Sequence, residues 1–156
     1  MDAYSLVKAL HVVGAAVLLG TGAGIAFFML MAHRTGDVAT IAHTAGVVVL
    51  ADTLFTLTAV IAQPATGALL AHMAGFPLFE GWVALSLVLY GVVGLFWLPV
   101  VWMQIRMRDI ARAAAKAGAP LPGTYGCLFR WWLAFGFPAF AAVLAIIWLM
   151  VAKPAL

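Results

Sequence analysis

Hydrophobic residues along the chain fall into four long runs, which three short breaks separate. The runs predict helices over about residues 5–32, 38–73, 80–116 and 127–151. Each run is long enough to cross a hydrocarbon core of roughly 30 Å, which takes about 20 apolar residues. The breaks contain the glycine, proline and polar residues that end helices. The pattern therefore predicts an all-α, polytopic membrane protein, a four-transmembrane-helix bundle that forms one domain over residues 1–156.

Composition supports the same class of protein. Of the 156 residues, 67% are hydrophobic and 8% are charged. A soluble domain has about 25% charged residues, so this chain has too few to coat a water-exposed surface. The single Cys127 excludes an internal disulfide. The first run is longer than the apolar region of a cleavable signal peptide and ends without a small-residue cleavage pattern, so we expect it to be retained.

The distribution of cations predicts the orientation. Two cations, Lys8 and Lys153, lie near the ends of the chain. Six lie around the first and third breaks, namely Arg34, Arg106, Arg108, Arg112, Lys116 and Arg130. By the positive-inside rule these two breaks face the cytoplasm. We therefore expect a multi-pass protein of the bacterial inner membrane with both termini on the periplasmic side. Its surroundings would be membrane lipids, and a net charge of +3 is no nucleic-acid footprint.

Small residues form a face on the first helix. Ala16, Gly20 and Gly24 are spaced by four residues, which lets another helix approach closely in lipid. The partner is another helix of this chain, a second copy in a homo-oligomer, or a membrane partner. The glycines between Gly20 and Gly24 do not form a dinucleotide loop, because no strand precedes them.

Asp52 is the carboxylate that we place at mid-depth in the membrane. A charge there costs about 2.5–3.5 kcal/mol, and ionisable residues at this depth are functional-site candidates. Burial should favour the neutral form, which donates a hydrogen bond. Asp52, Thr56, Ala59 and Gln63 share one face of the second helix, which we expect to point into the bundle. Asp52 is then either a proton relay or polar-ligand site, or a structural hydrogen-bonding group.

Tyr90, Trp97 and Gln104 recur at seven-residue spacing and share one face of the third helix. This face could line a pocket for a flat ring, although aromatic residues at helical spacing are more often packing residues. Pro64, Pro99 and Pro138 lie inside predicted helices, where proline removes a hydrogen bond and bends the helix.

His11 lies about two turns inside the first helix, and imidazole is a common axial ligand of haem iron. Spacing alone favours a buried histidine bonded to the backbone. By depth, His11 pairs with His72 and His33 pairs with His43, the arrangement in which a bundle holds haem between facing helices. The chain lacks the motifs of soluble hydrolases and nucleotide enzymes.

The chain resembles, over nearly its whole length, the predicted bacterial membrane proteins of domain-of-unknown-function family 2269. The matching stretches are Leu6-Val-Lys-Ala-Leu-His11, Ala51-Asp-Thr-Leu-Phe-Thr56, Gln63-Pro-Ala-Thr-Gly67, Leu89-Tyr90, Trp97-Leu-Pro-Val-Val-Trp-Met-Gln-Ile-Arg106 and Trp148-Leu-Met-Val-Ala-Lys-Pro154. This resemblance implies a fold but no activity. More distantly, the start of the chain looks like that of HemJ-like protoporphyrinogen oxidases and CopD-like proteins. In HemJ-like proteins a first-helix histidine is linked to haem, and that position falls on His11.

These observations lead to three hypotheses, which leave open whether the protein is an enzyme. The first is a small inner-membrane redox protein that binds b-type haem through His11 as the metal ligand. His72 and Trp97 would then also contact the cofactor, and Asp52, Gln63 and Tyr90 would supply the reactive lining. The second is a non-enzymatic membrane module, an accessory subunit or small carrier, assembled through the glycine face. The third is a proton-coupled transporter that uses Asp52.

Overall fold

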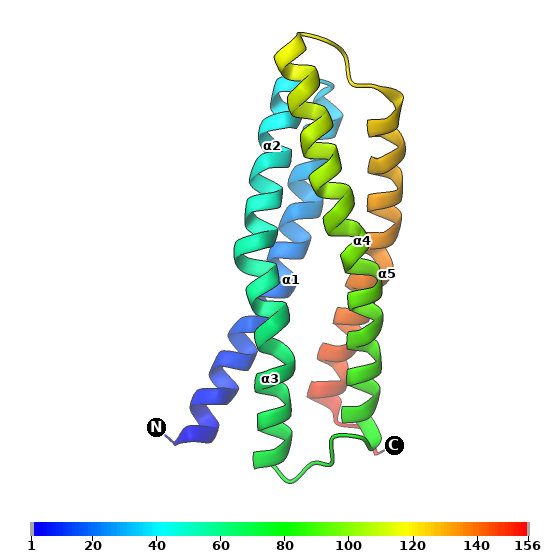
Figure 1. Ribbon diagram of the computed structural model, residues 1–156. Coiled ribbons are helices and arrows are strands. Elements are labelled where there is room, and N and C mark those ends of the chain that lie inside the picture. Colours follow the sequence, from blue (N-terminus) through cyan, green and yellow to red (C-terminus); the bar gives the residue numbers. More distant parts are fainter. Residues whose placement is uncertain (1, 156) are drawn as a thin grey trace.

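Four long helical rods run up and down along one axis in the computed structural model, which describes residues 2–155 (Figure 1). The second rod consists of two α-helices joined without a break by a π-helical segment, η1. In chain order the elements are α1 (Ala3–Thr35), α2 (Val38–Ala51), η1 (Asp52–Thr56), α3 (Leu57–Met73), α4 (Gly81–Ala117) and α5 (Gly123–Ala152).

The predicted four-helix architecture is confirmed for the described residues. Four rods are long and apolar enough to cross a membrane, and the structure describes no strand in residues 2–155. The second rod covers 36 residues, and neither it nor its neighbours end at Pro64, Pro99 or Pro138. A rod of this length is about 54 Å long, so it extends beyond a hydrocarbon core of roughly 30 Å.

Local sequence signals set the ends of the first two rods. The Asp2 carboxylate accepts a hydrogen bond from the Ser5 backbone N–H at 3.2 Å, and Asp37 accepts one from Thr40 at 2.7 Å. These are N-cap interactions, which satisfy backbone donors that the first helical turn leaves free. Gly36 ends α1 with a φ of 68°, a left-handed conformation in which a side chain would be strained.

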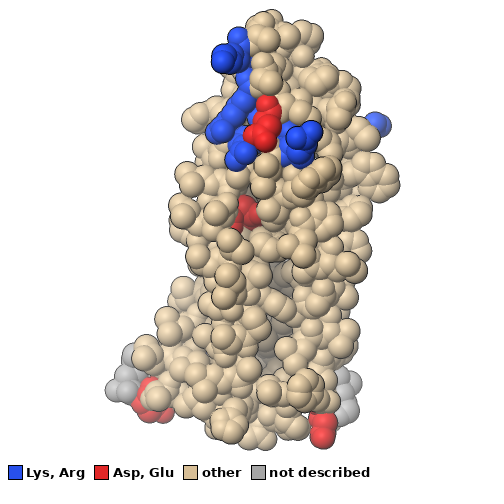
Figure 2. Space-filling model, in the orientation of Figure 1, with Lys and Arg blue, Asp and Glu red and all other residues tan. Residues whose placement is uncertain are grey.

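Both chain ends lie at the same end of the bundle, as an even number of rods requires (Figure 1). We call this the terminal end. The opposite end, where α1 and α4 finish, carries the six cations at Arg34, Arg106, Arg108, Arg112, Lys116 and Arg130, and we call it the basic end. Figure 2 shows Lys and Arg side chains gathered there around an acidic residue. The assignment of the basic end to the cytoplasm stays a prediction.

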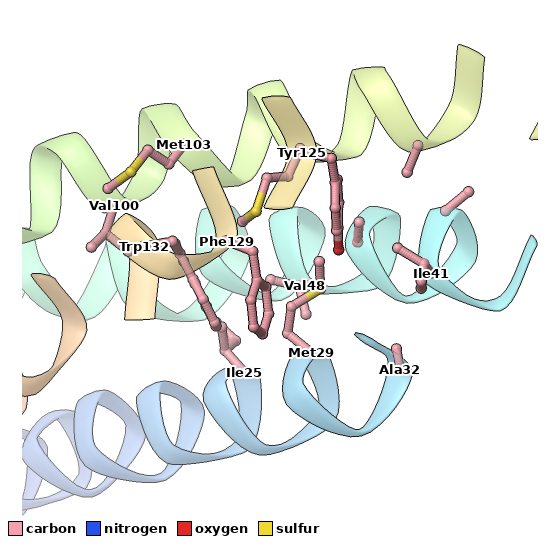
Figure 3. Close-up of a cluster of buried hydrophobic side chains, with 14 residues drawn as sticks. Ile25, Met29, Ala32, Ile41, Val48, Val100, Met103, Tyr125, Phe129 and Trp132 are labelled. Atoms are coloured by element: carbon pink, nitrogen blue, oxygen red, sulfur yellow. The ribbon is translucent and has the colours of Figure 1, made fainter. Parts of the chain in front are cut away.

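The tightest packing lies between the middle of the bundle and the basic end. Met29, Ile41, Met107 and Tyr125 have almost no exposed surface. Around them, aromatic and aliphatic side chains from α1, α2, α4 and α5 form one cluster (Figure 3). In the terminal half, α4 and α5 separate from α1 and α3 (Figure 1). The bundle is therefore closed towards the basic end and more widely spaced towards the terminal end.

The glycine face of α1 points away from the rest of the chain. A Cβ placed on Gly20 would have no neighbour within 4 Å, and one on Gly24 would meet only Phe28 of the same helix. Ala16 and Gly20 are also exposed. The expectation that these residues seat another helix of this chain is therefore wrong. Contact with a second copy or a membrane partner stays a prediction.

Candidate functional site

Asp52 begins the π-helical segment in the middle of the second rod, and its side chain is 5% exposed. In η1 the backbone N–H of Leu57 bonds to the carbonyl of Asp52, five residues back. Thr53 Oγ1 donates to the Val49 carbonyl at 2.8 Å, and such bonds from Thr to the preceding turn compete with the helical ladder. Single π-helical turns of this kind are frequent at functional sites.

A hydrogen-bond partner of the Asp52 carboxyl group comes from α4. With the Gln104 amide oriented so that both of its neighbours are satisfied, its nitrogen donates to Asp52 Oδ2 at 3.1 Å. The Gln104 oxygen then accepts a hydrogen bond from Trp132 Nε1 of α5 at 3.2 Å. Gln104 is itself buried. One amide therefore joins three of the four rods at mid-depth.

Two further polar groups lie beside this carboxyl group without a hydrogen bond of normal geometry. They are the hydroxyl of Thr56, one turn along the same rod, and the indole N–H of Trp97 on α4. Thr56 is 6% exposed, and its Oγ1 and Trp97 Nε1 are buried atoms with no other partner among the described residues. Buried polar groups normally have partners, so unsatisfied ones indicate strain or a functional role.

The site has hydrogen-bonding capacity but no compensating cation. Within residues 2–155 the structure shows one ion pair, between Arg108 and Asp109 at 2.8 Å, which leaves Asp52 without a cationic partner. The indole N–H can only donate to the carboxyl oxygens, whereas a hydroxyl and an amide can donate to a carboxylate or accept from a protonated carboxyl group. The site can thus hold a proton or a small hydrogen-bonding ligand, next to the packed cluster that closes the basic half.

His11 belongs to a second polar cluster, where α1 meets α3. Its Nδ1 lies 2.8 Å from Thr66 Oγ1, and the Thr66 hydroxyl donates to the Ala62 carbonyl at 2.8 Å. Since a hydroxyl has one proton, the bond to Ala62 requires that His11 Nδ1 carries the hydrogen between it and Thr66. This tautomer leaves Nε2 as a free acceptor. The alternative prediction, a histidine side chain bonded to a backbone carbonyl, does not describe this geometry.

The side chain of Gln63 connects the same two helices, because it bonds to the backbone of α1. Its Nε2 donates to the His11 carbonyl at 2.9 Å. Two glycines make room for this contact: a Cβ on Gly14 would lie 2.2 Å from Gln63 Nε2, and one on Gly67 would lie 3.1 Å from the His11 ring. Gln63 was predicted as part of the reactive lining with Asp52, and its face is buried as expected. Its amide, however, binds α1.

Tyr90, also predicted as reactive lining, donates its hydroxyl to the carbonyl of Val60 on α3. Pro64 lies four residues after Val60 and has no N–H, so this carbonyl lacks its usual helical donor. The tyrosine supplies the missing hydrogen bond from another helix. Tyr90, Trp97 and Gln104 all reach the second rod, which confirms the predicted common face of these residues and gives each a different partner.

The described residues contain no pair of buried histidines. His72 is exposed, and His11 is the one buried histidine among the described residues. No group of three or more His, Cys, Asp or Glu in residues 2–155 is arranged to hold a metal ion. His11 is thus the one buried imidazole that a haem would find in this part of the chain, and its Nδ1 is already held by Thr66.

At the basic end, His33, which was predicted to pair with His43, packs among aromatic rings. Its ring stacks on Phe129 with centroids 3.9 Å apart, and Tyr125 stacks nearby at 5.9 Å. His43 is exposed on α2. His33 Nδ1 and the Tyr125 hydroxyl are buried without partners among the described residues. These groups therefore belong to an aromatic packing cluster between α1 and α5.

The sequence predicted Asp52 and Trp97 as site residues and placed Thr56 and Gln104 on the same two faces, but it did not predict that Gln104 and Trp132 meet at Asp52. Gln104 was detectable, since it continues the seven-residue spacing of Tyr90 and Trp97. Thr56 was detectable from its place one turn after Asp52. Trp132 had no such signal, because aromatic residues at a helix start usually mark the membrane interface.

The fold and the buried polar site define the class of this protein: a helical membrane protein that crosses the bilayer four times. The sequence also matches the model of a family described as predicted integral membrane proteins, DUF2269, over residues 5–154. The chain belongs to this family. No curated protein and no solved structure matches the sequence, so the distant likeness to HemJ-like and CopD-like proteins stays a prediction.

Proposed function

We propose that this protein carries protons across the membrane and that Asp52 is the group that binds them. The observation that carries the proposal is the buried Asp52 carboxyl group, which has one hydrogen-bond partner in Gln104 and two unsatisfied neighbours in Thr56 and Trp97. An unpaired carboxyl group in the membrane is costly, and such groups commonly act as proton relays.

The packing of the rods differs on the two sides of Asp52. Towards the terminal end, α3 and α4 are more widely spaced (Figure 1). On the other side, the packed cluster that includes Val48, Val100 and Met103 separates Asp52 from the basic end. A proton bound at Asp52 would have to cross this largely apolar cluster, whose buried polar groups include the Tyr125 hydroxyl and, stacked beside it, His33 Nδ1.

Proton flux into vesicles tests the proposal. The purified protein is reconstituted into liposomes that contain a pH-sensitive dye, and a potassium diffusion potential drives proton entry. We expect flux above that of empty vesicles for wild type, and flux equal to that of empty vesicles for Asp52→Asn. Asp109→Asn is the matched control, because Asp109 is exposed at the basic end, and it should behave as wild type. Equal flux for wild type and Asp52→Asn would refute the role of Asp52.

A second candidate is the predicted haem protein, which the free Nε2 of His11 favours. Haem would supply electron-transfer chemistry, while His11 would hold the iron and Thr66 would orient the imidazole. Absorption spectra of protein purified from haem-replete cells, oxidised and reduced, test this. The candidate predicts a Soret band that His11→Ala abolishes and that His72→Ala, at an exposed position, preserves. A colourless preparation eliminates it.

A further inference from the structure

A groove runs along the surface between α2 and α4 near the basic end. Its volume is about 470 Å³. Two exposed residues of its lining carry nitrogen groups, the guanidinium of Arg112 and the imidazole of His43. The lining residues are Ala42, His43, Gly46, Val47, Leu50, Arg112 and Ala115. None of these takes part in the Asp52 site, so the groove is a separate feature of the molecule.

The Arg112 guanidinium group lies directly on the backbone of α2. A Cβ on Gly46 would be 2.7 Å from Arg112 Nη2 and 3.6 Å from Cζ, so the absence of a side chain at Gly46 creates the seat. A guanidinium has five N–H donors. Among the described residues Arg112 has no acidic partner, whereas Arg108 on the same helix is paired with Asp109 at 2.8 Å. The contact with the α2 backbone therefore holds the Arg112 guanidinium in place, and no carboxylate among the described residues pairs with it.

The groove changes from polar to apolar along its length. His43 and Arg112 lie towards the basic end, and Val47 and Leu50 follow on α2 towards the middle of the bundle. Val47 is 52% exposed and Leu50 is 58% exposed. Side chains on a helix lean towards its N-terminus, so Arg112 leans from the end of α4 towards the membrane. A cation above an exposed apolar strip matches a molecule that has an anionic head and a hydrocarbon tail.

We infer that this groove binds an anionic phospholipid. Arg112, with His43 beside it, binds the phosphate of the headgroup, and Val47 and Leu50 contact an acyl chain. Guanidinium groups suit phosphate because they make paired, charge-assisted hydrogen bonds. The other cations of the basic end add attraction to an anionic lipid surface. The apolar strip distinguishes this ligand from a free phosphate ion, which would not require it.

Lipid binding to the purified full-length protein tests the inference. The protein in a neutral detergent is titrated with phosphatidylglycerol or phosphatidylcholine, and bound lipid is counted by native mass spectrometry. We expect preferential binding of phosphatidylglycerol, weakened about tenfold by Arg112→Gln, a change equal to about 1.4 kcal/mol. Arg108→Gln removes the same charge from the same helix and should change binding less than about twofold. Gly46→Ala keeps every charge but displaces the guanidinium, so it should also weaken binding.

Three results would overturn the inference. Equal losses for Arg112→Gln and Arg108→Gln would show a general charge effect. Unchanged binding in Arg112→Gln would show that the guanidinium takes no part. Displacement of phosphatidylglycerol by an equal concentration of inorganic phosphate would point to a soluble anion. Because Arg112 is exposed, we expect its substitution to leave the fold intact. The comparison of Arg112→Gln with Arg108→Gln therefore tests lipid binding even if Gly46→Ala does not fold.

Discussion

The Tyr90 hydroxyl donates a hydrogen bond to the Val60 carbonyl, the one acceptor that Pro64 deprives of its partner within α3. Pro64 and Tyr90, on different rods, therefore compensate each other. Proline inside a membrane helix is tolerated where a neighbouring helix satisfies the freed backbone group. The two rods that separate in the terminal half are joined at this point by one side chain.

Removal of this hydrogen bond should destabilise the protein. Tyr90→Phe should lower the free energy of unfolding by about 0.5–1.5 kcal/mol, the usual net contribution of one hydrogen bond. In a Pro64→Ala background the residue at position 64 can donate to Val60 itself, so the same substitution should cost less. Unfolding in a denaturing detergent measures both. Equal costs in the two backgrounds would show that Tyr90 does not replace the donor that Pro64 lacks.

Gly14 and Gly20 provide a matched pair of substitutions on one helix. Gly14→Ala should destabilise the fold by about 1–3 kcal/mol, because its Cβ would collide with Gln63 and break the hydrogen bond to the His11 carbonyl. Gly20→Ala meets open space and should be neutral or stabilising by up to about 1 kcal/mol, since alanine favours helix more than glycine does. Thermal unfolding followed by circular dichroism distinguishes them. A larger loss at Gly20 would contradict the structure.

The open glycine face predicts an effect on association without an effect on folding. The double substitution Gly20→Leu and Gly24→Leu should leave the melting temperature unchanged, because both positions lack neighbours on other helices. If this face joins two copies or a membrane partner, the double variant should run as a smaller particle in size-exclusion chromatography with light scattering. A particle mass equal to that of wild type would show that the glycine face takes no part in an interface.

Gln104 connects Asp52 to Trp132, so its loss leaves two buried groups unsatisfied. Gln104→Leu should destabilise the protein by about 1–3 kcal/mol for each group that loses its partner. Gln104→Glu keeps an acceptor for the Trp132 indole and should cost less while Asp52 or the new carboxyl group is protonated. Unfolding at pH 5 and pH 8 measures the difference. A Gln104→Leu variant as stable as wild type would show that the network is not formed.

Asp37 at the start of α2 predicts acid sensitivity outside the membrane. Its hydrogen bonds with Thr40 hold the pKa of the carboxyl group below the ordinary value of 3.8. Because the folded-state pKa is the lower one, the cap stabilises the fold above pH 3.8 and loses this effect as the pH falls through the folded-state value. Asp37→Asn caps equally well without titrating, so its stability should fall less in this range. Identical acid profiles of melting temperature for the two proteins would contradict the assignment.

Much of the candidate site was predictable, because helical periodicity places residues on faces. Asp52, Thr56, Ala59 and Gln63 are all buried, as their shared azimuth predicts. Periodicity could not predict that Gln63 would bind α1 while Asp52 would bind α4. That division depends on the height and rotation at which each helix meets its neighbours, and on η1, whose π-helical turn changes the rotation of the rod.

By itself the sequence determined the four membrane-crossing rods, the capped starts of the first two, the cluster of cations at one end and the family of the protein. These properties are local, because they depend on the length of apolar runs, on residues within one turn and on charge distribution. Tertiary structure alone decided which polar groups meet: Asp52 with Gln104, Tyr90 with Val60, and Arg112 with the bare backbone at Gly46. It also decided that Gly14 lies against Gln63 of α3, whereas Gly20 has no neighbour on another helix. In lipid all apolar faces are similarly stable, so close packing between helices selects the pairing.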